Sequence, residues 1–432
     1  MSSPDSSSRV DAFAALRVPH IGALVLGRAL SMLALQFVSV AVGWDLYERT
    51  GDPWMLGLVG LVQIVPALAL TLPAGAIVDR YRRRNVALAA YLALSVATFG
   101  LALVSWLGAP VQLIFVMLAI AGAARPFAIP AVNAIPAEIL QPKDLSNAYS
   151  WMISSNQVSS IGGPALVGLL IALTNEAGSS YLLAGVAEIL FVVILLRLPR
   201  GNPPSSGGRQ TLRDIFAGVS FIRRNEVFLA AITLDLFAVL LGGAIALLPV
   251  YAKEILEVGP AGLGLLRSAP AVGALLAALV TTRIAPWERP GRVLMIVVAI
   301  FGVTTVGFGL SRDMAFSLFC LFVGGAADSV SMVIRGTLQQ VITPNHLRGR
   351  VSAVNSLFIG LSNELGAFRS GASAAILGPV ISVAGGGIGT LLVVIAVALG
   401  WRSLDRIGPL HTLRPLEEEP RSESVTAESA TA

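Results

Sequence analysis

Twelve long apolar runs follow one another along the chain, separated by short polar segments. Each run approaches the roughly 20 residues that an α-helix needs to cross the hydrocarbon core of a bilayer. Lipid offers no partner for backbone N–H and C=O groups, so apolar runs of this length predict membrane-spanning helices. The predicted spans are 21–44, 54–76, 86–107, 110–131, 146–173, 180–198, 227–250, 261–282, 292–310, 314–335, 351–374 and 378–400.

Composition supports this pattern and excludes a soluble globular protein. Hydrophobic residues make up 55% of the 432 residues, charged residues only 13%, and the mean hydropathy is +0.79. Such values are typical of a polytopic protein that is surrounded by the lipid bilayer. The net charge of +5 comes largely from arginines between the spans. It therefore reports membrane topology and predicts no nucleic-acid partner.

The distribution of positive charge predicts the orientation in the membrane. If both termini face the cytoplasm, the outer loops hold three of the 30 Lys and Arg residues, namely Arg49, Lys253 and Arg312. Most of the others then lie on the inner side, which is the asymmetry expected of a membrane protein in this orientation. We therefore expect a multi-pass protein of a bacterial inner membrane with both termini in the cytoplasm.

The chain repeats itself in two halves. The segment GLVQIVPALALTLPAGAIVDR, which begins at Gly60, aligns with GLLRSAPAVGALLAALVTTRI, which begins at Gly264. Paired six-helix halves of this kind are a design of secondary transporters. Between the halves, a Pro-, Gly- and Ser-rich linker precedes a stretch with apolar residues at helical spacing, 212–225. That stretch is either an amphipathic helix at the cytoplasmic surface or a simple loop.

These observations predict five parts of the chain. They are a cytoplasmic N-terminal segment (1–20), an N-terminal six-helix bundle (21–198), a cytoplasmic linker with an amphipathic helix (199–226), a C-terminal six-helix bundle (227–400) and a cytoplasmic, largely disordered tail (401–432). The disorder of the tail is expected from its polar, acidic composition after residue 415.

The loop GAIVDRYRRRNV, residues 75–86, joins the second and third predicted spans. Its arginines would be costly in hydrocarbon, so we expect the loop to face the cytoplasm. Asp79 stands at the carboxyl end of a helix, where the helix dipole disfavours an acid. It therefore requires a partner, either a neighbouring arginine or the amino end of another helix. The alternative is a plain positive anchor at the membrane surface.

This loop resembles the signature G-x-x-x-D-R-x-x-R-R of the major facilitator superfamily, matched by Gly75, Asp79, Arg80, Arg83 and Arg84. Arg82 stands where that pattern usually has a glycine. ARPFAIPAVNAIPAEILQPKDLSNA and LRGRVSAVNSLFIG are similar to the drug and siderophore exporter branch, especially to enterobactin-exporter-like and macrolide-efflux-like proteins. The resemblance implies an all-α membrane fold of two pseudo-symmetric six-helix bundles, a central cavity lined by spans 1, 4, 7 and 10, and a monomer.

Ionisable residues inside spans are functional candidates because they are costly in lipid. Arg28, Arg125, Asp235 and Asp328 all fall in the cytoplasmic third of spans that the resemblance assigns to the cavity. Our hypothesis is an inter-half charge cluster that closes the inner side and breaks when the inner mouth opens. Pairing and unpairing would change the proton affinity of the acids, which a proton antiporter requires. The alternative is a set of static ion pairs that pack the bundle.

Further polar and aromatic residues are candidates for substrate contact. Glu364 lies near the middle of the membrane and is a second proton site or a substrate contact, unless Arg369 neutralises it. Arg267 either attracts an anionic substrate group or extends outward to the membrane surface. The amides equally suit interhelical hydrogen bonds, and the aromatics and methionine equally suit packing. The cavity candidates are Gln36, Phe37, Gln63, Phe127, Gln157, Phe237, Arg267, Met332 and Asn363.

No phosphate-binding loop, histidine cluster or nucleophile with its base occurs in the sequence, so we predict no enzyme, no metal and no cofactor. The sequence favours a secondary active transporter that works by alternating access. We expect a proton-coupled exporter of small amphiphilic molecules, either drug-like (multidrug efflux) or siderophore-like. The alternatives are a lysophospholipid or lipid flippase of the same fold, an importer, and a membrane sensor or scaffold that does not transport.

Overall fold

The computed structural model describes residues 13, 15–199, 212–284, 287–401, 404 and 408, with all of these side chains except those of 212–215 and 284. Most of the predicted N-terminal segment and tail, and residues 200–211 of the predicted linker, lie outside the described residues.

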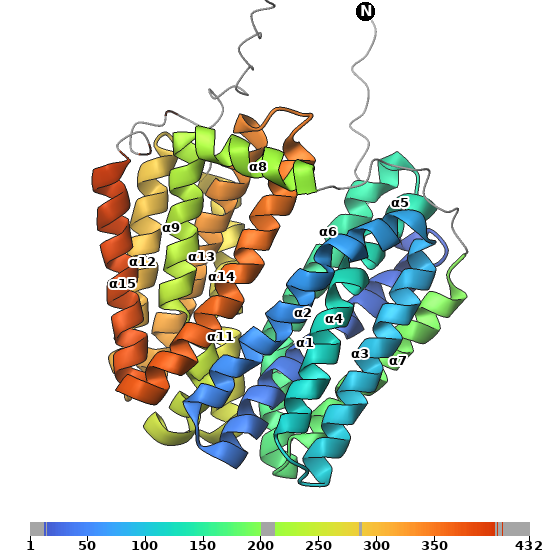
Figure 1. Cartoon of the computed structure of the whole chain (residues 1–432), viewed down its shortest axis with the longest axis horizontal. Helices are drawn as coiled ribbons and strands as arrows, with labels where there is room; N and C mark the ends of the chain where they lie inside the picture. Colours follow the sequence, from blue (N-terminus) through green and yellow to red (C-terminus); the bar gives the residue numbers. More distant parts are fainter. Residues whose placement is uncertain are drawn as a thin grey trace, which may run out of the picture.

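Every regular element in the described ranges is helical, which confirms the predicted fold class. The helices form two groups that stand side by side in Figure 1. The N-terminal group contains η1 (Ala15–Arg17), α1 (Ile21–Thr50), α2 (Pro53–Arg80), α3 (Arg83–Trp106), α4 (Gln112–Ala134), α5 (Pro136–Ile139), α6 (Pro142–Thr174) and α7 (Gly178–Arg197).

The C-terminal group begins with α8, a helix that follows residues 200–211 of the predicted linker. It contains α8 (Leu212–Arg224), α9 (Glu226–Gly242), η2 (Ile245–Leu247), α10 (Leu248–Val250), a π-helical turn η3 (Tyr251–Ile255), α11 (Gly259–Ile284), α12 (Pro290–Leu310), α13 (Met314–Ile342), α14 (Arg348–Leu377) and α15 (Pro379–Gly400). We call the side of the molecule where α1 begins and α15 ends the terminal side, and the opposite side the far side.

Eleven helical stretches in the described ranges are long and apolar enough to cross a membrane. The remaining predicted span, 351–374, corresponds to α14, which has 30 residues but is more polar, with Asn355, Asn363, Glu364 and Arg369 along it. Its neighbours explain how it keeps this polarity, because α14 packs against α2 and α9 and so meets protein on two sides. Polar residues within the membrane are tolerated where a bundle surrounds them.

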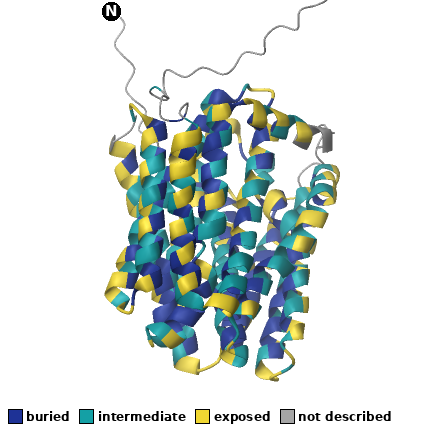
Figure 2. Ribbon diagram, turned by 60° about the vertical axis from the view of Figure 1, so that its left-hand side comes forward, coloured by how far each residue is buried: buried dark blue, intermediate teal, exposed yellow. Residues whose placement is uncertain are grey.

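Large apolar side chains stay exposed on the outer surfaces of the helices, for example Leu103, Leu173 and Val303. Figure 2 shows exposed residues around the outside of the bundles and buried residues in their interior. Exposure of so large an apolar surface to water would be unfavourable, whereas contact between this surface and lipid tails is not. The chain is therefore a multi-pass membrane protein.

The two groups pack against each other mainly through α2 with α14 and α6 with α11. Glycines allow this close approach. A Cβ on Gly371 would lie 2.5 Å from the Cα of Gly57, and one on Gly264 would lie 3.1 Å from the Cα of Gly168. Gly264 is one member of the repeated pair found in the sequence. The other, Gly60, also lies at the interface, since its Cβ would be 2.7 Å from the carbonyl oxygen of Glu364.

The predicted span 227–250 is not one continuous helix. α9 ends at Gly242, and a short 3₁₀ turn, a helical turn and a π-helical turn complete the seventh span, which we take as residues 226–255. Ending a helix inside a membrane frees carbonyl groups that need donors. Arg369 supplies them: its Nε donates to Leu240 O at 3.1 Å, and its Nη2 donates to Leu241 O. Ser370 Oγ donates to Gly243 O at 2.7 Å.

α8 crosses the terminal side of the C-terminal group, above α9 and α14 in Figure 1. Ile222 of α8 is buried against Val351 and Val354 of α14. The apolar side of this helix is therefore covered by protein, which explains why a short amphipathic segment keeps a helical structure here.

Candidate functional site

The two halves enclose a cavity of about 370 Å³ between α1, α2, α4, the seventh span, α11 and α14. This volume suits a small molecule, for which pockets measure roughly 300–1,000 Å³. The lining is mostly apolar, with a few polar side chains. Six of the predicted site residues contribute to it: Gln36, Gln63, Arg125, Arg267, Asn363 and Glu364.

Three of the described lining residues are charged, namely Arg125, Arg267 and Glu364. Both arginines interact electrostatically with Glu364. Within the described ranges, however, Glu364 and Arg125 make no hydrogen bond or close ion pair. Arg267 donates one hydrogen bond across the halves, from Nη2 to Ser39 Oγ at 2.5 Å. The three charged groups of the cavity therefore lie near one another, and one hydrogen bond, from Arg267 to Ser39, is described for them.

Arg369 does not neutralise Glu364, contrary to the alternative raised from the sequence. Its guanidinium bonds to the carbonyl oxygens of Leu240 and Leu241 instead. Arg369 follows Glu364 by five positions on α14, a spacing that turns the two side chains to different sides of the helix. The carboxylate of Glu364 therefore lines the cavity without a bond to Arg369.

Five other cavity candidates do not line this cavity. Phe37 is buried in the apolar core of the far side, and Phe127 packs against the core of the N-terminal group. Gln157 Nε2 donates to Ala271 O at 3.1 Å, so it makes the interhelical hydrogen bond that was the alternative for it. Phe237 and Met332 are 40% and 58% exposed outside the cavity lining.

The four charges predicted to form one inter-half cluster are not brought together in this conformation. Asp235 pairs with Arg335 inside the C-terminal group, between α9 and α13. Asp328 lies near the same guanidinium. Arg335 Nε also donates to Ser331 Oγ at 3.2 Å. A cavity of about 10 Å³, roughly one water molecule in size, lies against Asp235 and Asp328.

Arg28 is buried in the N-terminal group, and its described neighbours belong to that group rather than being the acids Asp235 and Asp328. It lies near Tyr91, whose hydroxyl is 2.7 Å from Ser31 Oγ. Glu188 of α7 interacts electrostatically with both Tyr91 and Arg125. Arg28 Nε and Glu188 Oε2 have no hydrogen-bond partner among the described residues. Arg28 therefore stays among residues of its own half, and Asp235 pairs within the C-terminal half.

Sequence reasoning missed Arg335 as the partner of the acids. Arg335 is the last residue of the predicted span 314–335 and was not among the candidate residues. Arg335 follows Asp328 by seven residues, which is close to two helical turns and puts both on one face of α13. That spacing was the available signal. Glu188, in the predicted span 180–198, was not among the candidate residues either.

The signature loop holds the N-terminal group together. Arg83 Nη1 lies 3.4 Å from Glu138 Oε1, and Arg84 Nε donates to Leu195 O at 2.7 Å. Arg80 stacks over Tyr81, 5.9 Å from the ring centroid. These contacts attach the start of α3 to α5 and α7 and position the loop at the terminal side.

Asp79 makes no hydrogen bond or ion pair in the described ranges, so the partner expected for it is not engaged here. A Cβ on Gly75 would meet nothing within 4 Å. Gly75 therefore has open space beside it, and Asp79 is half-buried. Arg82, in place of the usual glycine, has φ −56° and ψ 120°, which any L-residue adopts. The turn therefore does not require a glycine.

At the far side, the ends of α1 and the seventh span meet. Tyr47 Oη donates to the carboxylate of Glu254, and Lys253 Nζ lies 2.8 Å from Glu48 Oε2. Lys253 also lies 5.8 Å from the centroid of the Tyr47 ring. The inter-half hydrogen bonds and ion pairs described here run from mid-membrane to this side.

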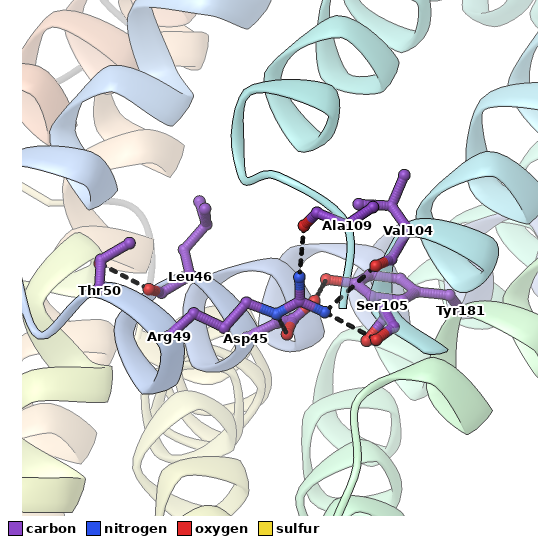
Figure 3. A network of polar contacts seen from close by, with 8 residues as sticks. All are labelled: Asp45, Leu46, Arg49, Thr50, Val104, Ser105, Ala109 and Tyr181. Atoms are coloured by element: carbon purple, nitrogen blue, oxygen red, sulfur yellow. Dashed lines mark hydrogen bonds and ion pairs between the residues drawn. The ribbon is translucent and has the colours of Figure 1, made fainter. Parts of the chain in front are cut away.

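A polar network anchors the far end of α1 within its own group (Figure 3). Arg49 Nε lies 2.7 Å from Asp45 Oδ1, and Nη1 and Nη2 donate to Ala109 O at 3.1 Å and Ser105 O at 2.8 Å. Tyr181 Oη donates to Asp45 Oδ2 at 3.4 Å. The helix end that meets the other half is therefore firmly attached to α3, α7 and the loop before α4.

Comparisons with known proteins agree with this architecture. A family model described as Major Facilitator Superfamily matches residues 24–367. Enterobactin exporter EntS of Shigella flexneri is 26% identical over 383 residues, covering 88% of this chain and 91% of that protein. Enterobactin exporter EntS of Escherichia coli O81 (strain ED1a) is 25% identical, with the same coverage.

Solved structures show the same fold. A POT family transporter in complex with 5-aminolevulinic acid has a TM-score of 0.71 at 11% identity, covering 89% of this chain and 96% of that one. A bacterial homolog of the human lysosomal transporter Spinster, inward-facing and occupied, has a TM-score of 0.68 at 15% identity, with coverages of 89% and 96%. The matched proteins are transporters and not enzymes, as predicted. The chain belongs to the Major Facilitator Superfamily of membrane transporters.

Proposed function

We propose that this protein is a proton-coupled exporter of small amphiphilic molecules, drug-like or siderophore-like, in a bacterial inner membrane. One observation carries the proposal: a cavity of small-molecule size lies between two helix groups, and the described polar contacts between the groups lie in mid-membrane and at the far side. A cavity between two movable halves is the arrangement that alternating access requires.

The arginine-rich end of α2 and start of α3 support a cytoplasmic terminal side, because positive charge stays on that side of the membrane. The contacts between Tyr47 and Glu254 and between Lys253 and Glu48 then close the outer side. Figure 1 shows the two groups diverging toward the terminal side. We infer an inward-facing state, in which Asp79 gains its partner only when the inner side closes.

The cluster of Asp235, Asp328 and Arg335 is our candidate for proton coupling. Two acids share one arginine, so the cluster carries one negative charge in excess when both acids are ionised. A proton cancels that excess and weakens the hold of Arg335 on α9. Val239 of α9 lines both the small cavity beside the acids and the central cavity. This shared wall gives a direct route from proton binding to substrate binding.

Transport in proteoliposomes tests the proposal. Enterobactin and ethidium are offered to vesicles that carry a pH gradient, and accumulation is measured with and without the gradient. We expect gradient-driven accumulation of at least one of them. Asp235→Asn and Asp328→Asn should each remove the response to the gradient while leaving gradient-free counterflow. Full gradient-driven transport by both variants would exclude this proton site.

A further inference from the structure

We propose that Arg125 and Arg267 form an anion-binding subsite in the central cavity, which selects amphiphilic substrates with one negative charge. The proposal names the substrate class of the transporter proposed above and rests on that function for its role in transport. Its evidence is the charge, the free donors and the lining of the cavity.

The charge count comes first. Arg125 and Arg267 contribute two positive charges to the described lining and Glu364 contributes one negative charge. An empty cavity with an ionised Glu364 thus carries one positive charge in excess. Uncompensated charge is costly away from bulk water, so a ligand with a single negative charge is the complement.

A second acid near Arg125 does not cancel this excess. Glu188 interacts with Arg125 from inside the N-terminal group, but it does not line the cavity. Arg28 lies inside the same group and, like Glu188, acts on Tyr91. These two buried residues add one positive and one negative charge, which sum to zero, so the excess of one positive charge across Arg125, Arg267 and Glu364 remains.

The arginines also have donors to spare. A guanidinium has five N–H donors in a planar fork that fits an oxyanion with two parallel hydrogen bonds. Arg125 makes no hydrogen bond in the described ranges, and Arg267 commits only Nη2 to Ser39. Glu364 is close enough to act on both arginines but bonds to neither. An incoming oxyanion therefore finds donors that no other group occupies.

The rest of the lining fits the body of an amphiphile. Leu35, Val38, Val59, Leu118 and Leu263 present apolar surface, and the side chains of Gln36 and Gln63 provide scattered polar contacts. A pocket of apolar walls with a few convergent polar groups fixes the orientation of its ligand through those groups. The substrate we infer has an apolar or aromatic body and a carboxylate, sulfonate or ionised phenol at one end.

Arg125 lies on α4 and Arg267 on α11, so they belong to different halves. An anion held by both would bridge the halves at the cavity, beside the existing bond of Arg267 to Ser39. The same bridge links substrate occupancy to the relative position of the two groups. Substrate charge thus acts on the conformational step as well as on binding.

Three probes with one fluorescent group test the proposal: dansylglycine (anion), dansylamide (neutral) and dansylcadaverine (cation). Their binding to the full-length protein in lipid nanodiscs is measured by dansyl fluorescence at constant pH. We expect dansylglycine to bind about tenfold or more tightly than dansylcadaverine, as hydrogen bonds to charged groups would give. Arg125→Gln and Arg267→Gln should each reduce that preference about tenfold, and Glu364→Gln should increase it.

Two controls keep the test clear of folding effects. Arg283→Gln makes the same change on α11 at an exposed position outside the cavity and should leave the preference unchanged. Arg267→Lys keeps the charge and should retain most of it. Failure of dansylglycine to bind, or equal binding of anion and cation, would overturn the subsite. Gradient-driven transport of ethidium or enterobactin would still stand in that case, so the two proposals fail separately.

Discussion

The first helices of the two halves occupy equivalent places in the repeat but have different structures. α1 runs unbroken for 30 residues, whereas the seventh span stops at Gly242 and resumes through short turns. α1 carries the buried Arg28 without a hydrogen-bond partner at Nε, and α9 carries Asp235 in an ion pair with Arg335. The C-terminal half thus has both the break and the paired acid. We infer that the moving parts of the mechanism are concentrated there and that the N-terminal half is the more rigid frame.

Removing the arginine of the C-terminal cluster should have the largest effect. Arg335→Gln leaves Asp235 and Asp328 buried without their cation, which typically costs about 3–5 kcal/mol. We expect a marked fall in the thermal unfolding temperature in detergent. The double variant Asp235→Asn with Arg335→Gln should recover much of it. An unchanged unfolding temperature in the single variant would remove the distinction between the two halves.

Removing the donor to the broken helix should have an intermediate effect. Arg369→Gln deprives the carbonyl groups of Leu240 and Leu241 of their charged donor, which should cost about 2 kcal/mol. Thermal unfolding measures this loss, with Arg283→Gln as the matched control at an exposed site. If both variants unfold at the same temperature, the break does not depend on Arg369.

The smallest effect is expected where α1 and the seventh span meet. Tyr47→Phe removes the hydrogen bond to Glu254 and should weaken outer closure by about 1–2 kcal/mol. A cysteine at Gln36 should then react several-fold faster with an impermeant maleimide added from outside. Tyr81→Phe, at an exposed position on the terminal side, should leave the rate unchanged. Lys253→Gln should matter less than Tyr47→Phe, since its ion pair with Glu48 is partly exposed and exposed pairs contribute little.

Much of the fold could be predicted from local pattern. The membrane helices and the repeat follow from apolar length and from glycines such as Gly60 and Gly264, which turn out to lie at equivalent inter-half contacts. Arg267 was proposed from the sequence as a cavity residue, whereas Arg125 and Glu364 were proposed as gating or proton-coupling residues, and all three line the cavity. In each case the signal is carried by residues near one another in the chain, or by an ionisable group that lipid would reject.

Pairing could not be predicted in the same way. Asp235 was expected to meet Arg28 or Arg125 across the halves, yet it pairs with Arg335 of its own half. Arg369 was weighed as the partner of Glu364, yet it supports the end of α9. The contacts of a charged side chain depend on how each helix is rotated and on where the backbone breaks. The spacing of apolar residues along the sequence indicates neither.

The sequence by itself determined the membrane class, the number and places of the spans and the signature loop, because bilayer thickness and the cost of charge in lipid act on every residue separately. Only the tertiary structure decided which charges share a partner, where the seventh span breaks and which side chains reach the cavity. Those outcomes depend on distances between helices that are remote in the chain, and on backbone carbonyls such as Leu240 O that become available only once a helix has ended.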